Sequence, residues 1–177
     1  MIGALLVTQV VLWHAYSGDE ARALDQVAAQ YTAQHPDVRI ETVAIPYNAY
    51  TEKLEAAIPL GNGPDLFIAA HESLGEWRRL GLVAVQPRGD TALQPNLDKV
   101  LAADGGWLAL PLALKGPALV YRTDLVAQPP VDGQALLALA PSLLAKRLHP
   151  LVYETGSFYF HAPWIAGEGG AILDEEA

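Results

Sequence analysis

Polar and aromatic side chains follow three apolar segments of the sequence, and their types suit the binding of a hydroxyl-rich molecule such as a sugar. These residues are Tyr16, Ser17, Tyr47, Glu72 and Ser73. Aromatic faces can cover the apolar C–H faces of a sugar ring, while carboxylates and hydroxyls form hydrogen bonds with its hydroxyl groups. Two alternatives stay open: Tyr16 and Ser17 could serve only as turn and helix cap, and Glu72 as a solvated carboxylate at a helix start.

Two short motifs indicate other chemistry but lack residues that this chemistry needs. His71-Glu72 would need a second histidine four residues after the first to form a zinc-binding helix, and that position is Gly75. The loop 61–64 is rich in glycine, but no Gly-Lys-Ser/Thr follows, and Pro64 removes an N–H that a phosphate cradle would use. Cysteine is absent. We therefore expect no metal and no cofactor.

A glycoside hydrolase is the enzymatic alternative, because Glu72 and Glu154 could form a pair of carboxylates. No activated nucleophile or metal motif accompanies them, so the sequence favours a binding protein over an enzyme. The formal net charge is −9, without a basic cluster that could neutralise phosphates. Nucleic acid is therefore excluded as an expected partner.

The elements that must position these residues alternate between strand and helix. Hydrophobic periodicity and turn residues predict strands at 10–13, 38–42 and 66–70, and helices from Ser17 to about His35 and over 47–58. This order is typical of a parallel sheet with right-handed crossovers, so the predicted fold class is α/β. The carboxyl ends of such strands form the ligand-binding edge.

The second half of the chain continues the alternation with shorter elements. Helices are predicted at 74–80, 134–146 and 158–167, and strands at 107–110, 118–122 and 151–153. Trp13 and Trp164 are assigned to the core. The apolar start, residues 1–13, is too short to span a bilayer and is interpreted as the remnant of a signal sequence that leads into the first strand. The run 174–176 is interpreted as a solvated acidic end.

Several motifs, taken in order, resemble those of family 1 extracellular solute-binding proteins, the class that contains maltose-binding protein. The residues that carry the likeness are Leu12-Trp13 with Gly18 after it, Gly61-Asn62-Gly63-Pro64-Asp65-Leu66-Phe67, Ala70-His71-Glu72, Gly81-Leu82-Val83, Leu110-Pro111-Leu112-Ala113, Tyr121-Arg122-Thr123-Asp124-Leu125, Pro129-Pro130 and Phe158-Tyr159-Phe160-His161-Ala162-Pro163-Trp164-Ile165-Ala166 with Gly169-Gly170. Each motif is weak alone, but their order and spacing together are fairly specific for this family.

The resemblance implies a type II periplasmic binding protein-like fold, with two lobes that close on a ligand by a hinge. Residues 1–110 would form lobe one, and 111–177 the hinge crossover and part of lobe two. The chain would capture an oligosaccharide in the periplasm, or outside the cell at the membrane, and deliver it to an ABC permease. Sensing for a membrane signalling partner is the alternative. Besides the residues above, the implied ligand contacts are Lys115, Ser157, Tyr159 and Phe160.

The sequence departs from the maltose-binding branch at positions that affect the ligand. Where that branch typically has Trp, Arg and Glu, this chain has Ala69, Ser73 and Lys115. Lys115 would favour a hydroxyl-rich or an acidic sugar. Members of the family are about twice as long, so the chain of 177 residues is expected to be truncated. Apolar surface left uncovered in this way would favour self-association.

Overall fold

The computed structural model describes residues 7–90 and 92–171. The chain divides into two compact units, Met1–Pro111 and Leu112–Ala177, which are described separately below. Residues 1–6 of the predicted signal remnant and the acidic run 174–176 lie outside the described residues. Within the described residues, no helix has the length and apolar character that a membrane span requires.

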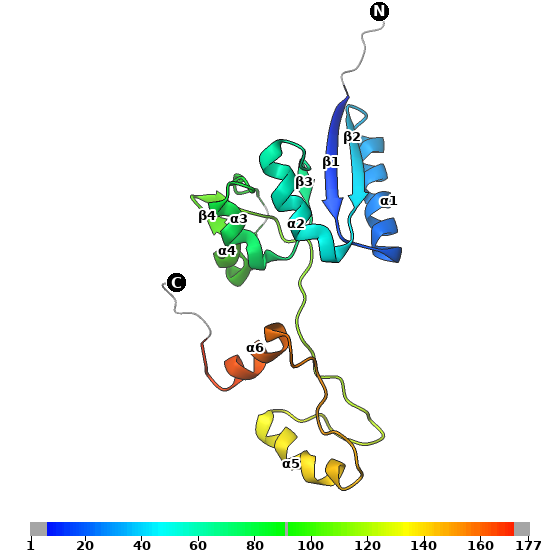
Figure 1. The fold of residues 1–177 in the computed structure, drawn as a ribbon, viewed down its shortest axis with the longest axis vertical. Coiled ribbons are helices and arrows are strands. Elements are labelled where there is room, and N and C mark those ends of the chain that lie inside the picture. The colour runs from blue at the N-terminus through cyan, green and yellow to red at the C-terminus, as the bar shows by residue number, and fades with distance from the viewer. Residues whose placement is uncertain (1–6, 91, 172–177) are drawn as a thin grey trace, which may run out of the picture. The chain divides into compact units, whose positions relative to one another are not determined.

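A parallel three-stranded sheet forms the centre of the first unit (Figure 1). Its strands are β1 (Thr8–His14), β2 (Val38–Ala44) and β3 (Leu66–Phe67), in the order β2-β1-β3. Helix α1 (Gly18–Gln34) connects β1 to β2, and α2 (Tyr47–Ala57) with the 3₁₀ turn Ile58–Leu60 connects β2 to β3. The predicted α/β order of this region is confirmed, although β3 is shorter than the predicted strand 66–70.

Local sequence accounts for the limits of α1. Ser17 has extended dihedral angles and occupies the N-cap position, although its side chain makes no capping hydrogen bond. Asp19 and Glu20 place negative charge in the first turn, where the helix dipole favours it. The helix ends at Gln34, before His35 and Pro36, because proline disfavours helical conformation in the preceding residue.

The outer side of β2 meets α1, which packs beside it (Figure 1). The N–H of Val38 donates to the His35 carbonyl at 2.9 Å, and the N–H of Ile40 donates to Oγ1 of Thr32 in α1 at 3.4 Å. Oγ1 of Thr42 donates to Asp25 of α1 at 2.6 Å. Side chains of the helix thus contact the strand along much of its length.

The core of the first unit lies where the sheet meets the following helices. Its buried members are Trp13, Ile45, Tyr50, Leu54, Leu74, Trp77, Leu82, Leu101 and Trp107. The assignment of Trp13 to the core is confirmed, since 7% of its surface is exposed. Oε1 of Glu55 in α2 accepts a 2.9 Å hydrogen bond from the Trp77 indole, which ties α2 to the helix that carries Trp77.

Short elements complete the first unit. They are the 3₁₀ turn His71–Ser73, α3 (Leu74–Arg79), α4 (Pro95–Leu101), β4 (Ala102–Ala103) and β5 (Gly106–Trp107). Gly81 follows α3 with φ of +71°, a left-handed conformation that glycine adopts readily and that commonly ends a helix. The strand predicted at 107–110 is reduced to β5, and α4 was not predicted.

The second unit contains α5 (Gly133–Leu144) and α6 (Phe158–Gly167), both of which were predicted. The predicted strands at 118–122 and 151–153 are wrong, because neither segment forms a ladder with a neighbour in the described residues. The assignment of Trp164 to the core is also wrong within this unit, since 38% of its surface is exposed.

Candidate functional site

The carboxyl ends of β1, β2 and β3 lie at one edge of the sheet, because all three strands are parallel. The loops that leave this edge carry five of the predicted binding residues: Tyr16, Ser17, Tyr47, Glu72 and Ser73. Tyr16 and Ser73 are half-buried, whereas Ser17 and Glu72 are exposed. Tyr47, at the first position of α2, is 84% exposed. The fold therefore gathers residues that are up to 57 positions apart in the sequence along one edge.

The backbone of Trp13 fixes the end of β3 against β1. Its carbonyl oxygen accepts the N–H of Ile68 at 2.9 Å and the hydroxyl of Tyr50 at 2.8 Å. Burial raises the pKa of Tyr50 to about 12, although a backbone hydrogen bond from Ile68 acts in the opposite direction. Tyr50 also follows the second predicted strand, but it is a core residue, and its hydroxyl bonds to the backbone of β1 near the carboxyl edge.

His14 is a buried residue at the same edge that the sequence reasoning missed. Only 2% of its surface is exposed. Its Nδ1 accepts the N–H of Tyr16 at 3.1 Å, and its carbonyl accepts the N–H of Ile45 at 2.9 Å. A polar ring at the last position of an apolar strand was the available signal.

The segment after β3 places Glu72 and Ser73 in a 3₁₀ turn that leads into α3. Ser73 occupies the N-cap position of α3 without a capping hydrogen bond from its side chain. The carboxylate of Glu72 is exposed, and the described residues contain no group of histidines and acids that could hold a metal ion. The hydroxyl of Ser73 can donate a hydrogen bond to a ligand or accept one, and the carboxylate of Glu72 can accept.

The other predicted binding residues belong to the second unit. Ser157 immediately precedes α6, and its carbonyl accepts the N–H of Phe160 at 3.2 Å. The rings of Tyr159 and Phe160 meet edge to face at 5.2 Å between centroids, and Tyr159 is 44% exposed. Lys115 is exposed in a segment without regular secondary structure.

A second histidine that sequence reasoning missed organises the start of α6. Nε2 of His161 lies 2.9 Å from the carbonyl oxygen of Thr155, and its Nδ1 lies 3.2 Å from the hydroxyl of Tyr153. Because a carbonyl only accepts, a neutral ring carries its proton on Nε2 and accepts from Tyr153 at Nδ1. These bonds hold the segment before α6, which contains Ser157, against the helix.

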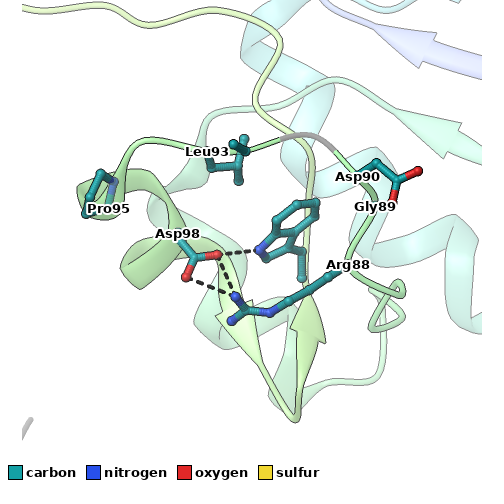
Figure 2. A pocket seen from close by; sticks show the side chains of 8 residues that line it. Arg88, Gly89, Asp90, Leu93, Pro95 and Asp98 are labelled. Atoms are coloured by element: carbon teal, nitrogen blue, oxygen red, sulfur yellow. Dashed lines mark hydrogen bonds and ion pairs between the residues drawn. The ribbon is translucent and has the colours of Figure 1, made fainter.

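A pocket of about 460 Å³ lies elsewhere in the first unit, and Figure 2 shows Arg88 and Asp98 bonded to one another at its wall. Oδ1 of Asp98 accepts the Trp107 indole N–H at 2.7 Å, and Arg88 reaches both oxygens of Asp98 at 3.0 and 3.1 Å. The bond from Trp107, followed by those from Arg88, lowers the pKa of Asp98. These bonds tie Asp98 of α4 to Trp107 of β5 and to Arg88.

A parallel sheet with polar side chains along its carboxyl edge is the architecture of an α/β ligand-binding domain. The family model described as bacterial extracellular solute-binding protein matches residues 16–177. The chain belongs to this family. The prediction of a solute-binding protein rather than an enzyme is thereby confirmed.

Relatives with known ligands are similar over part of their length. The chain is 34% identical to the maltotriose-binding protein of Pyrococcus abyssi over 127 residues, which are 69% of this chain and 28% of that protein. A cyclo/maltodextrin-binding protein complexed with maltotetraose is 25% identical with a TM-score of 0.73, over 94% of this chain and 45% of that one. The extracellular solute-binding protein of Staphylococcus aureus in complex with maltose is 25% identical with a TM-score of 0.65, over 96% of this chain and 46% of that one. The chain thus spans less than half the length of these relatives.

Proposed function

We propose that the chain is part of a receptor that captures an oligosaccharide of the maltodextrin kind in the periplasm and delivers it to an ABC permease. The carboxyl edge of the sheet supports this proposal, because the segments that follow its three strands carry aromatic, hydroxyl and carboxylate side chains. The relatives bound to maltose and maltotetraose support the class of ligand.

The residues of the edge offer complementary contacts to a sugar. The exposed ring of Tyr47 can cover a C–H face, and the half-buried ring of Tyr16 can do the same beside the end of β1. Glu72 would accept hydrogen bonds from sugar hydroxyls, while Ser17 and Ser73 can both donate and accept. Such contacts bind a ligand reversibly and transfer no group.

The second unit would supply the remaining contacts through Ser157, Tyr159, Phe160 and Lys115. In this proposal residues 1–110 are lobe one and 111–177 are the hinge crossover with part of lobe two. Lys115 distinguishes the chain chemically, because an exposed ammonium group would favour a sugar that carries a carboxylate over a neutral one.

Titration of the ¹⁵N-labelled chain with maltose, maltotriose, maltotetraose and a uronic oligosaccharide, followed by amide chemical shifts, tests the proposal. We expect saturable shifts in the loops after β1, β2 and β3. Glu72→Gln should weaken binding about tenfold, since it removes the charge that strengthens these hydrogen bonds. Lys115→Ala should weaken binding of the uronic sugar more than that of the neutral ones.

Asp37→Asn is the matched control, because Asp37 is an exposed carboxylate beside the amino end of β2, at the opposite edge of the sheet. It should bind within about twofold of the wild type. Absence of saturable shifts, or equal weakening by Glu72→Gln and Asp37→Asn, would contradict a sugar site at the carboxyl edge. If Lys115→Ala bound every sugar as the wild type does, Lys115 would not contact the ligand.

A further inference from the structure

The consecutive residues Trp13 and His14 form hydrogen bonds with the segments that follow all three strands. The Trp13 carbonyl accepts the N–H of Ile68 at 2.9 Å, just after β3, and the His14 carbonyl accepts that of Ile45 at 2.9 Å, just after β2. These two bonds come from the backbone, so any residue could provide them. They fix where the chain begins to turn towards Glu72 on one side and Tyr47 on the other.

The segment after β1 is held by a side chain instead. Nδ1 of His14 accepts the N–H of Tyr16 at 3.1 Å, which closes the turn between β1 and α1. A ring nitrogen accepts only when it carries no proton, so the neutral imidazole must hold its proton on Nε2. His14 is 2% exposed, so the surrounding protein holds its ring in place, and without this acceptor the Tyr16 N–H would lose its hydrogen bond within the fold.

The ring also packs against the residue that it positions. The centroids of the His14 and Tyr16 rings lie 5.8 Å apart at a tilt of 35°. One buried side chain therefore restrains both the backbone and the ring of Tyr16, and Ser17 follows directly. Packing alone would be satisfied by an apolar residue of similar size, whereas the hydrogen bond needs an acceptor at the position of Nδ1.

We propose that His14 is a positioning residue for the ligand site, which acts through its Nδ1 on Tyr16 and Ser17 without contacting the ligand itself. This inference rests on the proposed function, since Tyr16 and Ser17 are taken to contact the sugar. Without this acceptor the turn between β1 and α1 would become more mobile. Tyr16 and Ser17 would then lose conformational entropy when the ligand binds, and this cost would lower the affinity for the ligand.

The test compares His14→Leu with His14→Asn. Leucine keeps an apolar side chain of similar size but no acceptor, whereas the Oδ1 of asparagine can accept near the position of Nδ1. We expect the Tyr16 amide to exchange with deuterium at least tenfold faster in His14→Leu and at close to the wild-type rate in His14→Asn. The Ile45 amide, bonded to the His14 backbone, should exchange equally in all three proteins.

Maltotriose affinity, measured by the same amide titration, should fall about tenfold in His14→Leu and recover to within about threefold of the wild type in His14→Asn. Equal affinities in wild type and His14→Leu would overturn the positioning role. So would equal losses in both variants, because these would reflect packing alone.

Two further readouts keep this result separate from the proposed function. The nitrogen spectrum of His14 in the wild-type chain should show the tautomer with the proton on Nε2, and the other tautomer would overturn the inference even if neither variant folds. If the wild type binds no oligosaccharide, the proposed function and the ligand role of His14 both fail. The exchange rate of Tyr16 then reports only whether the hydrogen bond exists.

Discussion

The two units of the chain differ in how they use their apolar residues. Nine buried side chains form a continuous core in the first unit. Among the described residues of the second unit, Leu143 is the buried hydrophobic side chain, whereas Val120 and Val131 are each 90% exposed. Both units have apolar sequences, so hydrophobicity alone does not decide burial. A segment is buried only where neighbouring elements of the same unit can cover it.

Substitution of a core leucine should break this comparison most strongly. Leu54 is 1% exposed in the first unit, so Leu54→Ala should lower the free energy of unfolding by about 3 kcal/mol. Leu137 in α5 is 65% exposed, and Leu137→Ala should change the free energy of unfolding by less than about 0.5 kcal/mol. Urea unfolding followed by tryptophan fluorescence measures both. Equal effects would mean that α5 is buried in solution.

Alkaline pH should destabilise the first unit through Tyr50. Its pKa is raised from 10.0 to about 12 in the folded state, so the unfolded chain loses this proton first as pH rises. The stability contributed by the protonated hydroxyl is complete below pH 10 and is lost between pH 10 and 12, by about 1 to 2 kcal/mol.

Thermal unfolding from pH 9 to 12 measures this loss, with Tyr50→Phe as the control. That variant lacks the titrating hydroxyl, so its melting temperature should fall less steeply over the same range. An identical slope in both proteins would assign the alkaline transition to other groups.

The N-cap residues of α5 and α1 should contribute differently to the free energy of unfolding, and this difference is smaller than the effects above. Oδ1 of Asp132 accepts the Ala135 N–H at 2.7 Å at the start of α5, whereas Ser17 at the start of α1 makes no such bond. Asp132→Ala should therefore cost about 0.5 to 1 kcal/mol, and Ser17→Ala less than about 0.5 kcal/mol. Helical circular dichroism during urea unfolding measures both. A larger cost for Ser17→Ala would show that its hydroxyl caps α1 in solution.

Elements that depend on local signals could be predicted from the sequence. The periodicity after Ser17, the stop at His35-Pro36 and the apolar run at 10–13 gave α1 and β1 nearly correctly. Strands need partners that local sequence does not supply. The segment 118–122 has strand-forming residues but no neighbouring strand in the described part of the chain, and it stays irregular.

The candidate site could be predicted where strand direction places a residue, but not where its role depends on a specific contact in the fold. Residues that follow a strand, such as Tyr16 and Tyr47, reach the carboxyl edge because the direction of a strand fixes where its loop emerges. His14 could not be assigned in this way, because its role depends on a hydrogen bond within a turn. Tyr47 and Tyr50 both belong to α2, but Tyr50 is 5% exposed and lies in the core, whereas Tyr47 is 84% exposed.

The contacts between α1 and the outer side of β2 also affect how the chain meets other chains. The register places the N–H groups of Val38 and Ile40 on the side of β2 away from β1. Unpaired donors on such a strand would form a template on which a foreign strand could add, which is a common route to aggregation. Here His35 and Thr32 already accept these hydrogens. The helix that connects the first two strands, with the residue that follows it, therefore also occupies these two donors, which hinders addition of a foreign strand at the β2 edge.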